Sequence, residues 1–435
     1  MQNDPRFTVN RRQLLTLTGA AGLTGLTAAC SGPGTTTAPS SPEGPDTEGP
    51  AEGEVSFAHW RAEDKEVFDE LIADFESENS GITISQTIST STDYEAQALR
   101  RMRGGEIGDV APAFRGTQFE SFVESGLFVD LSDTDLVSRY NPSLITVGEQ
   151  DGKQYGFPYQ VVFNVPIANM DILESVGVQE SPQDWDSYIE MLEAIKAKGI
   201  TPIAFPGADA GNAGQLFNAM IMNIAPSDDM CTKIQAGEYK LTDDWFIEML
   251  RLYQQLGDYV QPNAGGTAVE PAEQMFATGD AALLSTGSYH IASVRTLGGE
   301  FPIDLAPPIT SAPGEARYVG IYNATFILGI NSASDVQPAA MAWLEYLSTP
   351  EIAARYADGT AQFASVQDVE YSNPDLQAIA PWLDKELALA PRYQFTDLDM
   401  RLAVEASAVD ALTGTDPEQA AEHAQEIVDQ RIAAS

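Results

Sequence analysis

The fold class is decided near the start of the folded body by the stretch Glu54–Trp60, which reads Glu-Val-Ser-Phe-Ala-His-Trp. Its larger side chains alternate at period two, which predicts a β-strand with one buried face. Residues 64–77 follow with an apolar stripe at helical spacing, and residues 81–85 alternate again. This β-α-β order predicts a parallel sheet covered by helices, an α/β fold. Ligands on such sheets gather at the carboxyl ends of strands, which makes the corner at Trp60 and Arg61 a candidate site.

Helical patterns dominate the rest of the chain. Asp184 is placed to cap a helix whose apolar residues recur until Gly199, where we expect the helix to end. A strand-like segment follows at 200–205. Further amphipathic helices are predicted at 243–256, 338–347 and 416–433.

Composition and charge exclude two classes of partner. The 435 residues include 64 Asp and Glu against 23 Lys and Arg, a formal net charge of −41. A nucleic-acid-binding protein needs a positive footprint, and electrostatic docking on anionic lipid needs one as well. The length indicates two or three domains with a sizeable core.

The N-terminus has the pattern of an export signal. Arg11 and Arg12 precede a short apolar stretch, and small residues lead to Cys30. The stretch is too short and too rich in Gly, Thr and Ala for a membrane-spanning helix. Residues 1–29 resemble a twin-arginine (Tat) signal that ends in a lipobox, although Thr27 departs from the usual Leu or Val. This resemblance implies cleavage before Cys30, lipidation of Cys30 and attachment to the outer face of the cell membrane.

Residues 30–53 contain almost no large apolar side chain. Such a segment cannot bury enough surface to offset its ordering entropy. We expect a disordered tether between a lipid anchor and the folded body. No later apolar run is long enough to cross a membrane.

The residues offer little support for catalysis or a metal site. The only histidines are His59, His290 and His423, and no metal-ligand spacing or nucleophile motif surrounds them. Cys231 follows two acidic residues, which would raise a thiol pKa, so we interpret it as structural. We therefore expect no catalytic residue, no metal and no cofactor.

Four blocks in a fixed order carry a resemblance to a known family. They are the strand and helix at 54–76 with 81–84, the segments 108–110 and 124–131, the segments 155–158, 169–173 and 181–185, and the segments 276–283 and 285–289. Together the blocks resemble the extracellular solute-binding proteins of bacterial ABC transporters, the family that includes maltose-binding and other sugar-binding lipoproteins.

The resemblance implies a two-lobed, periplasmic-binding-protein-like (type II) fold, with a hinge of crossing strands and a ligand cleft between the lobes. It places residues 54–160 and 311–347 in lobe I, and residues 161–310 and 348–435 in lobe II. It also implies a monomer that captures a carbohydrate and delivers it to the transmembrane permease subunits of an ABC importer.

The same resemblance implies which residues bind the ligand. Aromatic side chains would stack on apolar sugar faces, while polar side chains would satisfy the hydroxyl groups. Tyr289 stands where many relatives carry a stacking tryptophan. The full candidate set is Trp60, Arg61, Phe114, Arg115, Tyr159, Asp209, Asn212, Tyr289, Tyr322 and Asn323.

One departure from the family pattern leaves the identity of the ligand undecided. Relatives often have two tyrosines before an asparagine where this chain has Ile167 and Ala168. A carbohydrate is the first candidate for the ligand, followed by a polyol, a glycerol-phosphate-like solute or a peptide. A surface glycosidase is a more distant alternative, because it would require a pair of carboxylates in a defined geometry.

Overall fold

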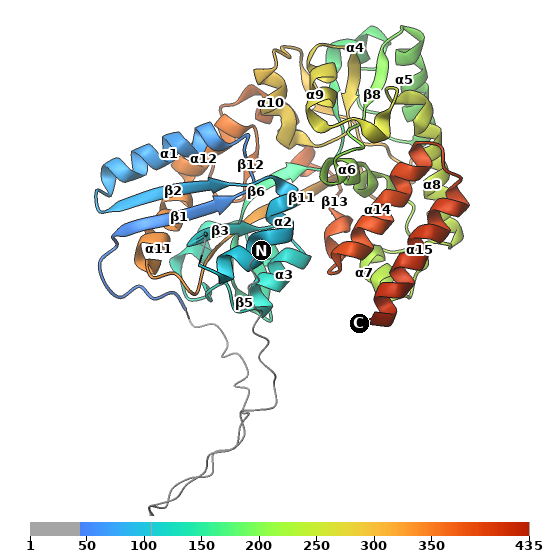
Figure 1. Cartoon of the computed structure of the whole chain (residues 1–435). Coiled ribbons are helices and arrows are strands. Elements are labelled where there is room, and N and C mark those ends of the chain that lie inside the picture. The colour runs from blue at the N-terminus through green and yellow to red at the C-terminus, as the bar shows by residue number, and fades with distance from the viewer. Residues whose placement is uncertain (1–43, 106, 435) are drawn as a thin grey trace, which may run out of the picture. The chain divides into compact units, whose positions relative to one another are not determined.

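The computed structural model describes residues 44–105 and 107–434 of the chain (Figure 1). The predicted export signal, the lipidation site at Cys30 and residues 30–43 of the predicted tether lie outside this part. Residues 44–52 contain no helix or strand and are mostly exposed. Among the residues that the structure describes, no helix combines the length and apolar character needed to cross a bilayer.

The larger sheet contains the predicted opening strand, β1, next to its edge strand β2. Its strand order is β12-β6-β11-β3-β1-β2, and β13 pairs with one end of β11. The strands are β1 (Gly53–His59), β2 (Ile82–Ile88), β3 (Val110–Ala113), β6 (Phe157–Phe163), β11 (Gly320–Ile330), β12 (Phe363–Ala364) and β13 (Leu387–Leu389). Its helices are α1 (Lys65–Glu78), α2 (Ser91–Arg103), α3 (Thr117–Glu124), α11 (Gln337–Leu347) and α12 (Pro350–Thr360).

The β-α-β prediction is confirmed. β1 and β2 are parallel, with Val55 opposite Ile84, and α1 connects them. Val55, Phe57 and His59 are fully buried, as their alternation predicts. The Phe57 ring packs edge-on against Phe68 of α1, so burial of one strand face and one helix stripe builds the core of this lobe.

A smaller sheet forms the second lobe, with strand order β10-β7-β9-β8. Its strands are β7 (Ile167–Asn169), β8 (Thr201–Ala204), β9 (Ala281–Leu284) and β10 (Ile303–Leu305). Around it lie α4 (Met170–Ser175), α5 (Trp185–Ala197), α6 (Ala210–Ile221), α7 (Met230–Gln235), α8 (Asp244–Leu256), α9 (Val269–Ala277), α10 (Ile291–Thr296) and α13 (Pro374–Ile379). The Asp184 side chain caps α5 by accepting from the backbone N–H of Ser187 at 3.0 Å, as predicted.

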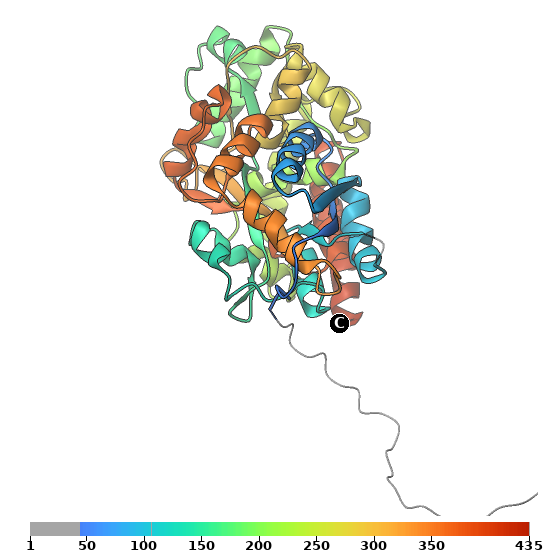
Figure 2. The same ribbon diagram turned by 90° about the vertical axis from the view of Figure 1, so that its left-hand side faces the viewer.

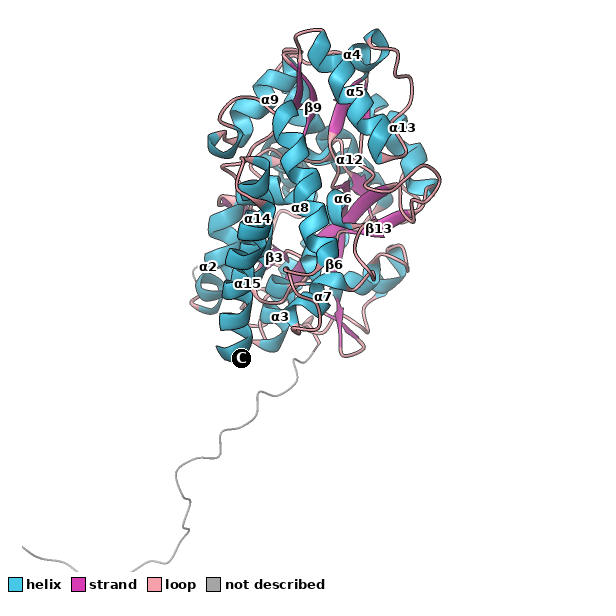
Figure 3. Ribbon diagram, turned by 90° about the vertical axis from the view of Figure 1, so that its right-hand side faces the viewer, coloured by secondary structure: helices cyan, strands magenta, loops and turns pink. Residues whose placement is uncertain are grey.

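The C-terminal part of the chain supplies two further helices to this lobe. These are α14 (Leu398–Leu412) and α15 (Pro417–Ala434), which lie against α8 (Figure 3). A small separate hairpin consists of β4 (Glu149–Gln150) and β5 (Lys153–Gln154).

Two connections between the sheets lie next to strands β6 and β11 of the larger sheet. Only residues 164–166 separate β6 of the larger sheet from β7 of the smaller one, and residues 306–319 return the chain from β10 to β11. β6 and β11 pair antiparallel along most of their length. Two lobes connected by neighbouring crossing strands are the architecture that the sequence predicts.

The division of the chain between the lobes remains a prediction, and the structure differs from it at α12 and at the two short strands β12 and β13, which belong to the larger sheet. We assigned residues from 348 onward to lobe II, but α12 packs beside α1 of the larger sheet (Figures 1 and 2). The Tyr356 ring lies 5.0 Å from the Phe68 ring, and the Tyr356 hydroxyl donates to the buried Asp64 carboxylate. Burial of this polar pair holds α12 on lobe I.

Candidate functional site

A cavity of about 780 Å³ is lined by residues of both lobes, a size typical of small-molecule sites. From lobe I it receives the corner after β1, the start of α2 and the facing sides of β6 and β11. From lobe II it receives the N-terminus of α6, part of α9, residues 289–293 and α14. Seven of the predicted residues line it: Trp60, Arg61, Phe114, Asp209, Asn212, Tyr289 and Asn323.

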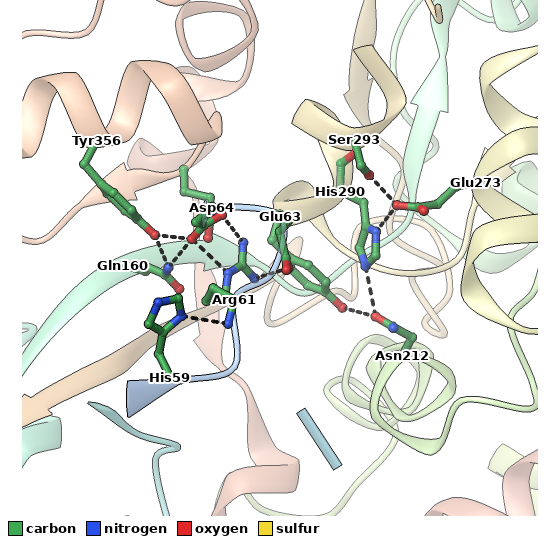
Figure 4. Close-up of polar contacts among 12 residues, drawn as sticks. His59, Arg61, Glu63, Asp64, Gln160, Asn212, Glu273, His290, Ser293 and Tyr356 are labelled. Atoms are coloured by element: carbon green, nitrogen blue, oxygen red, sulfur yellow. Dashed lines mark hydrogen bonds and ion pairs between the residues drawn. The ribbon is translucent and has the colours of Figure 1, made fainter. Parts of the chain in front are cut away.

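The corner after β1 positions Arg61 through two neighbours in the sequence. Arg61 Nε and Nη2 donate to the Asp64 carboxylate at 3.0 and 3.1 Å, and Nη1 lies 3.0 Å from Glu63 Oε1 (Figure 4). Burial would lower the pKa of Arg61, but the Asp64 and Glu63 carboxylates outweigh it and raise that pKa. The Arg61 guanidinium is therefore charged, held in place by hydrogen bonds, and balanced by two carboxylates.

Asp64 is a junction of several elements. Besides Arg61, it accepts hydrogen bonds from Gln160 Nε2 of β6 at 3.1 Å, from Gln362 Nε2 at 3.2 Å and from the Tyr356 hydroxyl. Such a fully satisfied buried carboxylate rigidifies its surroundings. Arg61 is thus held by the same group that joins α12 to the hinge strand β6.

His59 ends β1 beneath this corner. Its Nδ1 accepts from the backbone N–H of Arg61 at 3.1 Å, and its Nε2 lies 2.8 Å from Gln86 Oε1 of β2. Burial lowers the pKa of His59 to about 4. The ring is therefore a neutral structural element that fixes the backbone leading into the cavity.

An aromatic pair forms the apolar wall on the side of lobe I. The rings of Trp60 and Phe114 stack with centroids 3.7 Å apart and an angle of 23° between their planes. Trp60 is 8% exposed and Phe114 is half-buried, so Phe114 presents more surface to a ligand than Trp60 does. Their stacking holds both rings in place.

The facing wall consists of side chains that follow β9 and begin α6. The Tyr289 hydroxyl donates to Asn212 Oδ1 at 2.7 Å, and Asp209 caps α6 by accepting from the backbone N–H of Asn212 at 2.9 Å. Arg61 lies over the Tyr289 ring, with Cζ 5.8 Å from its centroid. Burial raises the pKa of Tyr289 well above its ordinary value, so the residue remains a hydrogen-bond donor.

Three predicted residues do not line this cavity. Tyr159 is fully buried in the core of lobe I, its ring 4.8 Å from that of Tyr356. Tyr322 is half-buried and packs against the apolar cluster at the hinge. Arg115 donates to Asn323 Oδ1 at 3.0 Å and to the carbonyl of Ala390, and it lines a second cavity of about 490 Å³.

These placements correct the expectation that all three residues face the cleft. On β6 the cavity is lined by Gln160 and Val162, whereas the Tyr159 side chain packs into the core of lobe I. Arg115 lies outside the cavity lining and donates a hydrogen bond to Asn323, which does line the cavity. Its burial lowers its pKa to about 10.

Several cavity residues were missed by the sequence analysis. His290 and Glu273 lie beside Tyr289, while Arg392 and Arg401 come from the last fifth of the chain. Arg392 forms a buried two-point ion pair with Glu405, at 2.6 and 2.8 Å, and donates to the carbonyl of Gly211 at 2.8 Å. Position next to Tyr289 could have indicated His290, whereas no local motif marks the two arginines.

Charged groups in the cavity are largely neutralised within the protein. Each of its three arginines lies in an ion pair: Arg61 with Asp64, Arg392 with Glu405, and Arg401 with Glu95. Within residues 44–105 and 107–434, no group of three or more His, Cys, Asp or Glu side chains is arranged to hold a metal ion. The arrangement can therefore enclose a polar ligand by stacking and hydrogen bonding.

Comparison with known proteins agrees with this architecture. A Multiple sugar-binding protein of Streptococcus mutans serotype c is 23% identical over 333 residues, which cover 75% of this chain and 78% of that protein. A solved chitin oligosaccharide binding protein superimposes with a TM-score of 0.74 at 20% identity, covering 88% of this chain and all of that one. The solute-binding protein RafE in complex with raffinose gives a TM-score of 0.74 at 18% identity, covering 87% and 99%.

These solved structures show a common two-lobed fold. A family model described as bacterial extracellular solute-binding protein matches residues 70–380, a span that includes most of the larger sheet, all of the smaller sheet and most of the cavity wall. The chain therefore belongs to the bacterial extracellular solute-binding protein family.

Proposed function

We propose that this chain is the receptor of an ABC importer, which captures a neutral saccharide in the cavity between its lobes and delivers it to the membrane permease. The observation that carries the proposal is the cavity of about 780 Å³, with an aromatic pair on one wall and Tyr289 on the other. Aromatic faces match the apolar faces of pyranose rings, and the polar side chains between them can satisfy hydroxyl groups.

The polar lining supports a ligand rich in hydroxyl groups. The cavity is lined by Gln160 of β6, Asn164 directly after β6, Asn212 of α6, and Asn323 and Thr325 of β11. Amide and hydroxyl side chains both donate and accept, as sugar hydroxyl groups do. A ligand enclosed without such partners would lose about 1–3 kcal/mol for each unsatisfied group.

The ion pairs argue against an anionic solute. Because Arg61, Arg392 and Arg401 are each paired with a carboxylate, none is free to bind a phosphate. A glycerol-phosphate-like ligand would also meet Glu63 and Glu270 in the lining. A neutral saccharide therefore fits better than the anionic alternative, with a polyol or a peptide behind it.

The relatives support the same ligand class. The names of the proteins compared above refer to sugars, chitin oligosaccharides and raffinose. The family is one of extracellular receptors rather than enzymes, and its location is extracytoplasmic. We infer that this chain acts as a monomer.

The test is a thermal-shift screen of the purified protein, followed by calorimetry. Raffinose, stachyose and chitin oligosaccharides are compared with glycerol 3-phosphate and a tripeptide as controls. A saccharide present at 100 times its Kd stabilises the folded state by about 2.7 kcal/mol, which raises the melting temperature measurably. Stabilisation by glycerol 3-phosphate or the peptide alone would refute the saccharide assignment.

We further propose that Cys30 carries the lipid anchor and that residues 1–29 are the export signal. The support is sequence alone: paired arginines, a short apolar stretch and a small residue before the cysteine. Cys30→Ser should release the protein from the membrane fraction, because anchoring depends on the acyl chains. Retention of this variant in washed membranes, measured by fractionation and mass spectrometry, would refute the anchor.

A further inference from the structure

A short chain of hydrogen bonds runs along the lobe II wall of the cavity, from α9 to α6. His290 Nδ1 bonds Glu273 Oε1, and His290 Nε2 lies 3.2 Å from Asn212 Oδ1 (Figure 4). The side chains of His290 and Glu273 are 12% and 9% exposed. The Ser293 hydroxyl donates to the same carboxylate oxygen and fixes its position.

The partners of His290 determine where its protons lie. A carboxylate and an amide oxygen both only accept hydrogen bonds, so each ring nitrogen must carry a hydrogen. Asn212 Oδ1 cannot donate to Nε2, and it already accepts from the Tyr289 hydroxyl at 2.7 Å. Both contacts of His290 are therefore satisfied as hydrogen bonds when each of its two ring nitrogens carries a hydrogen.

Three other charged groups near these hydrogen bonds, Arg61, Arg392 and Asp209, already have partners. Arg61 approaches Tyr289 from the corner after β1 but is bound to Asp64. Arg392 comes from residues 391–394 and is bound to Glu405. Asp209, at the start of α6, accepts from the α6 backbone. Glu273 is the carboxylate that lies against His290. Burial would raise the pKa of Glu273, but its hydrogen bonds with His290 and Ser293 outweigh burial and lower that pKa.

The orientation of the Asn212 amide has a consequence for ligand recognition. With Oδ1 occupied by Tyr289 and His290, the amino group Nδ2 remains, and it makes no hydrogen bond among the residues that the structure describes. Asn212 lines the cavity. If His290 were neutral and Nε2 an acceptor, the amide would have to turn and place its oxygen toward the ligand instead.

We propose that Glu273 is a positioning residue which, through a doubly protonated His290, fixes Asn212 as a hydrogen-bond donor to an oxygen acceptor of the ligand. The inference rests on the proposed function for the identity of the ligand as a saccharide. The acceptor would be a hydroxyl, ether or carbonyl oxygen. Glu273 thus determines whether Asn212 donates or accepts a hydrogen bond at the ligand, and it can do so without contacting the ligand itself.

The test is nuclear magnetic resonance of the protein labelled with ¹⁵N-histidine, without ligand, at about pH 7.5. That pH is about one unit above the ordinary pKa of histidine, so an unpaired ring would be mostly neutral. The chain has three histidines, and two serve as references: His59 is buried and neutral, and His423 is exposed on α15. Two-bond proton–nitrogen correlations report the protonation of each ring nitrogen.

We expect both nitrogens of His290 to carry protons in the wild-type protein. Glu273→Gln should convert the ring to a neutral form, while Glu270→Gln should leave it charged. Glu270 is the matched control, because it lies on the same helix, lines the same cavity and is exposed. A neutral His290 in the wild-type protein would overturn the proposal, and that measurement requires no variant to fold.

Binding gives a second readout, with raffinose as the probe. Loss of one fixed donor should weaken raffinose binding about 3- to 10-fold in Glu273→Gln. The control for binding is Glu174→Gln, on the exposed side of α4 and outside the cavity lining, which should change the affinity less than twofold. Equal affinity of Glu273→Gln and the wild type would also overturn the proposal. Failure of every saccharide to bind refutes the proposed function instead, since the histidine spectrum is recorded without ligand and decides the state of His290 alone.

Discussion

Glu95 of α2 and Arg401 of α14 form an ion pair across the two lobes, with 2.9 Å between Glu95 Oε2 and Arg401 Nη2. The two side chains are 21% and 6% exposed, and both line the cavity. On its other side, Arg401 Nε lies 4.0 Å from Glu405 Oε1. The pair therefore connects lobe I to the buried charges of lobe II, and opening of the lobes would have to break it.

Glu95→Gln should favour the open form. Loss of the charge weakens an interlobe contact by about 1 kcal/mol, a value at the upper end for partly exposed pairs, so saccharide affinity should fall about fivefold. Calorimetry measures the affinity, and small-angle scattering should show a larger radius of gyration without ligand. Asp69→Asn is the control, because its pair with Lys65 lies within α1. An unchanged affinity would show that this pair does not hold the lobes together.

The buried pair of Arg392 and Glu405 should be important for stability. Burial would lower the pKa of Arg392, but Glu405 outweighs it and raises that pKa. Glu405→Gln leaves a buried guanidinium without its counter-charge, which costs about 3–5 kcal/mol. Urea denaturation measures the loss. Glu418→Gln removes a partner of the exposed Arg251 and should leave the midpoint unchanged, so equal effects of the two variants would contradict this account.

His59 should make stability depend on pH. Its pKa is lowered to about 4 by burial, whereas an unfolded histidine has a pKa of about 6.5. Between these values the unfolded state binds more protons, so stability is complete above about pH 6.5 and is lost as the pH falls toward 4. The total loss from this residue is about 3 kcal/mol.

The measurement is the slope of the unfolding free energy against pH between about pH 4.5 and 6. His59→Gln should reduce that slope by up to about 1.4 kcal/mol per pH unit, whatever its effect on stability itself. His423→Gln, on the exposed side of α15, should leave the slope unchanged. A His59→Gln variant with the wild-type slope would mean that His59 can be protonated in the folded state.

The sequence predicted the elements better than it predicted the site. Alternation and helical spacing located β1, α1 and β2 and their parallel order, because each pattern is local. On β6 all seven residues are buried, so alternation could not show which face lines the cavity, and Tyr159 was placed on the wrong side. Arg401 and its partner Glu95 lie 306 positions apart, and only the closed tertiary fold brings them together.

Tyr289 gives the last prediction, which separates stacking from hydrogen bonding. Tyr289→Ala removes the ring facing Arg61 and the apolar wall, and should weaken saccharide binding by about 1–3 kcal/mol, or roughly 5- to 150-fold in Kd. Tyr289→Phe keeps the ring but loses the hydroxyl that donates to Asn212, which should cost about 0.5–1.5 kcal/mol. Tyr322→Phe is the control, since Tyr322 does not line the cavity, and its Kd should stay within twofold of the wild type. Calorimetry on the folded fraction measures all three variants. If Tyr289→Ala lowered the melting temperature but left Kd within twofold, Tyr289 would be a packing residue, and Phe114 with Trp60 would be the remaining platform for a sugar ring.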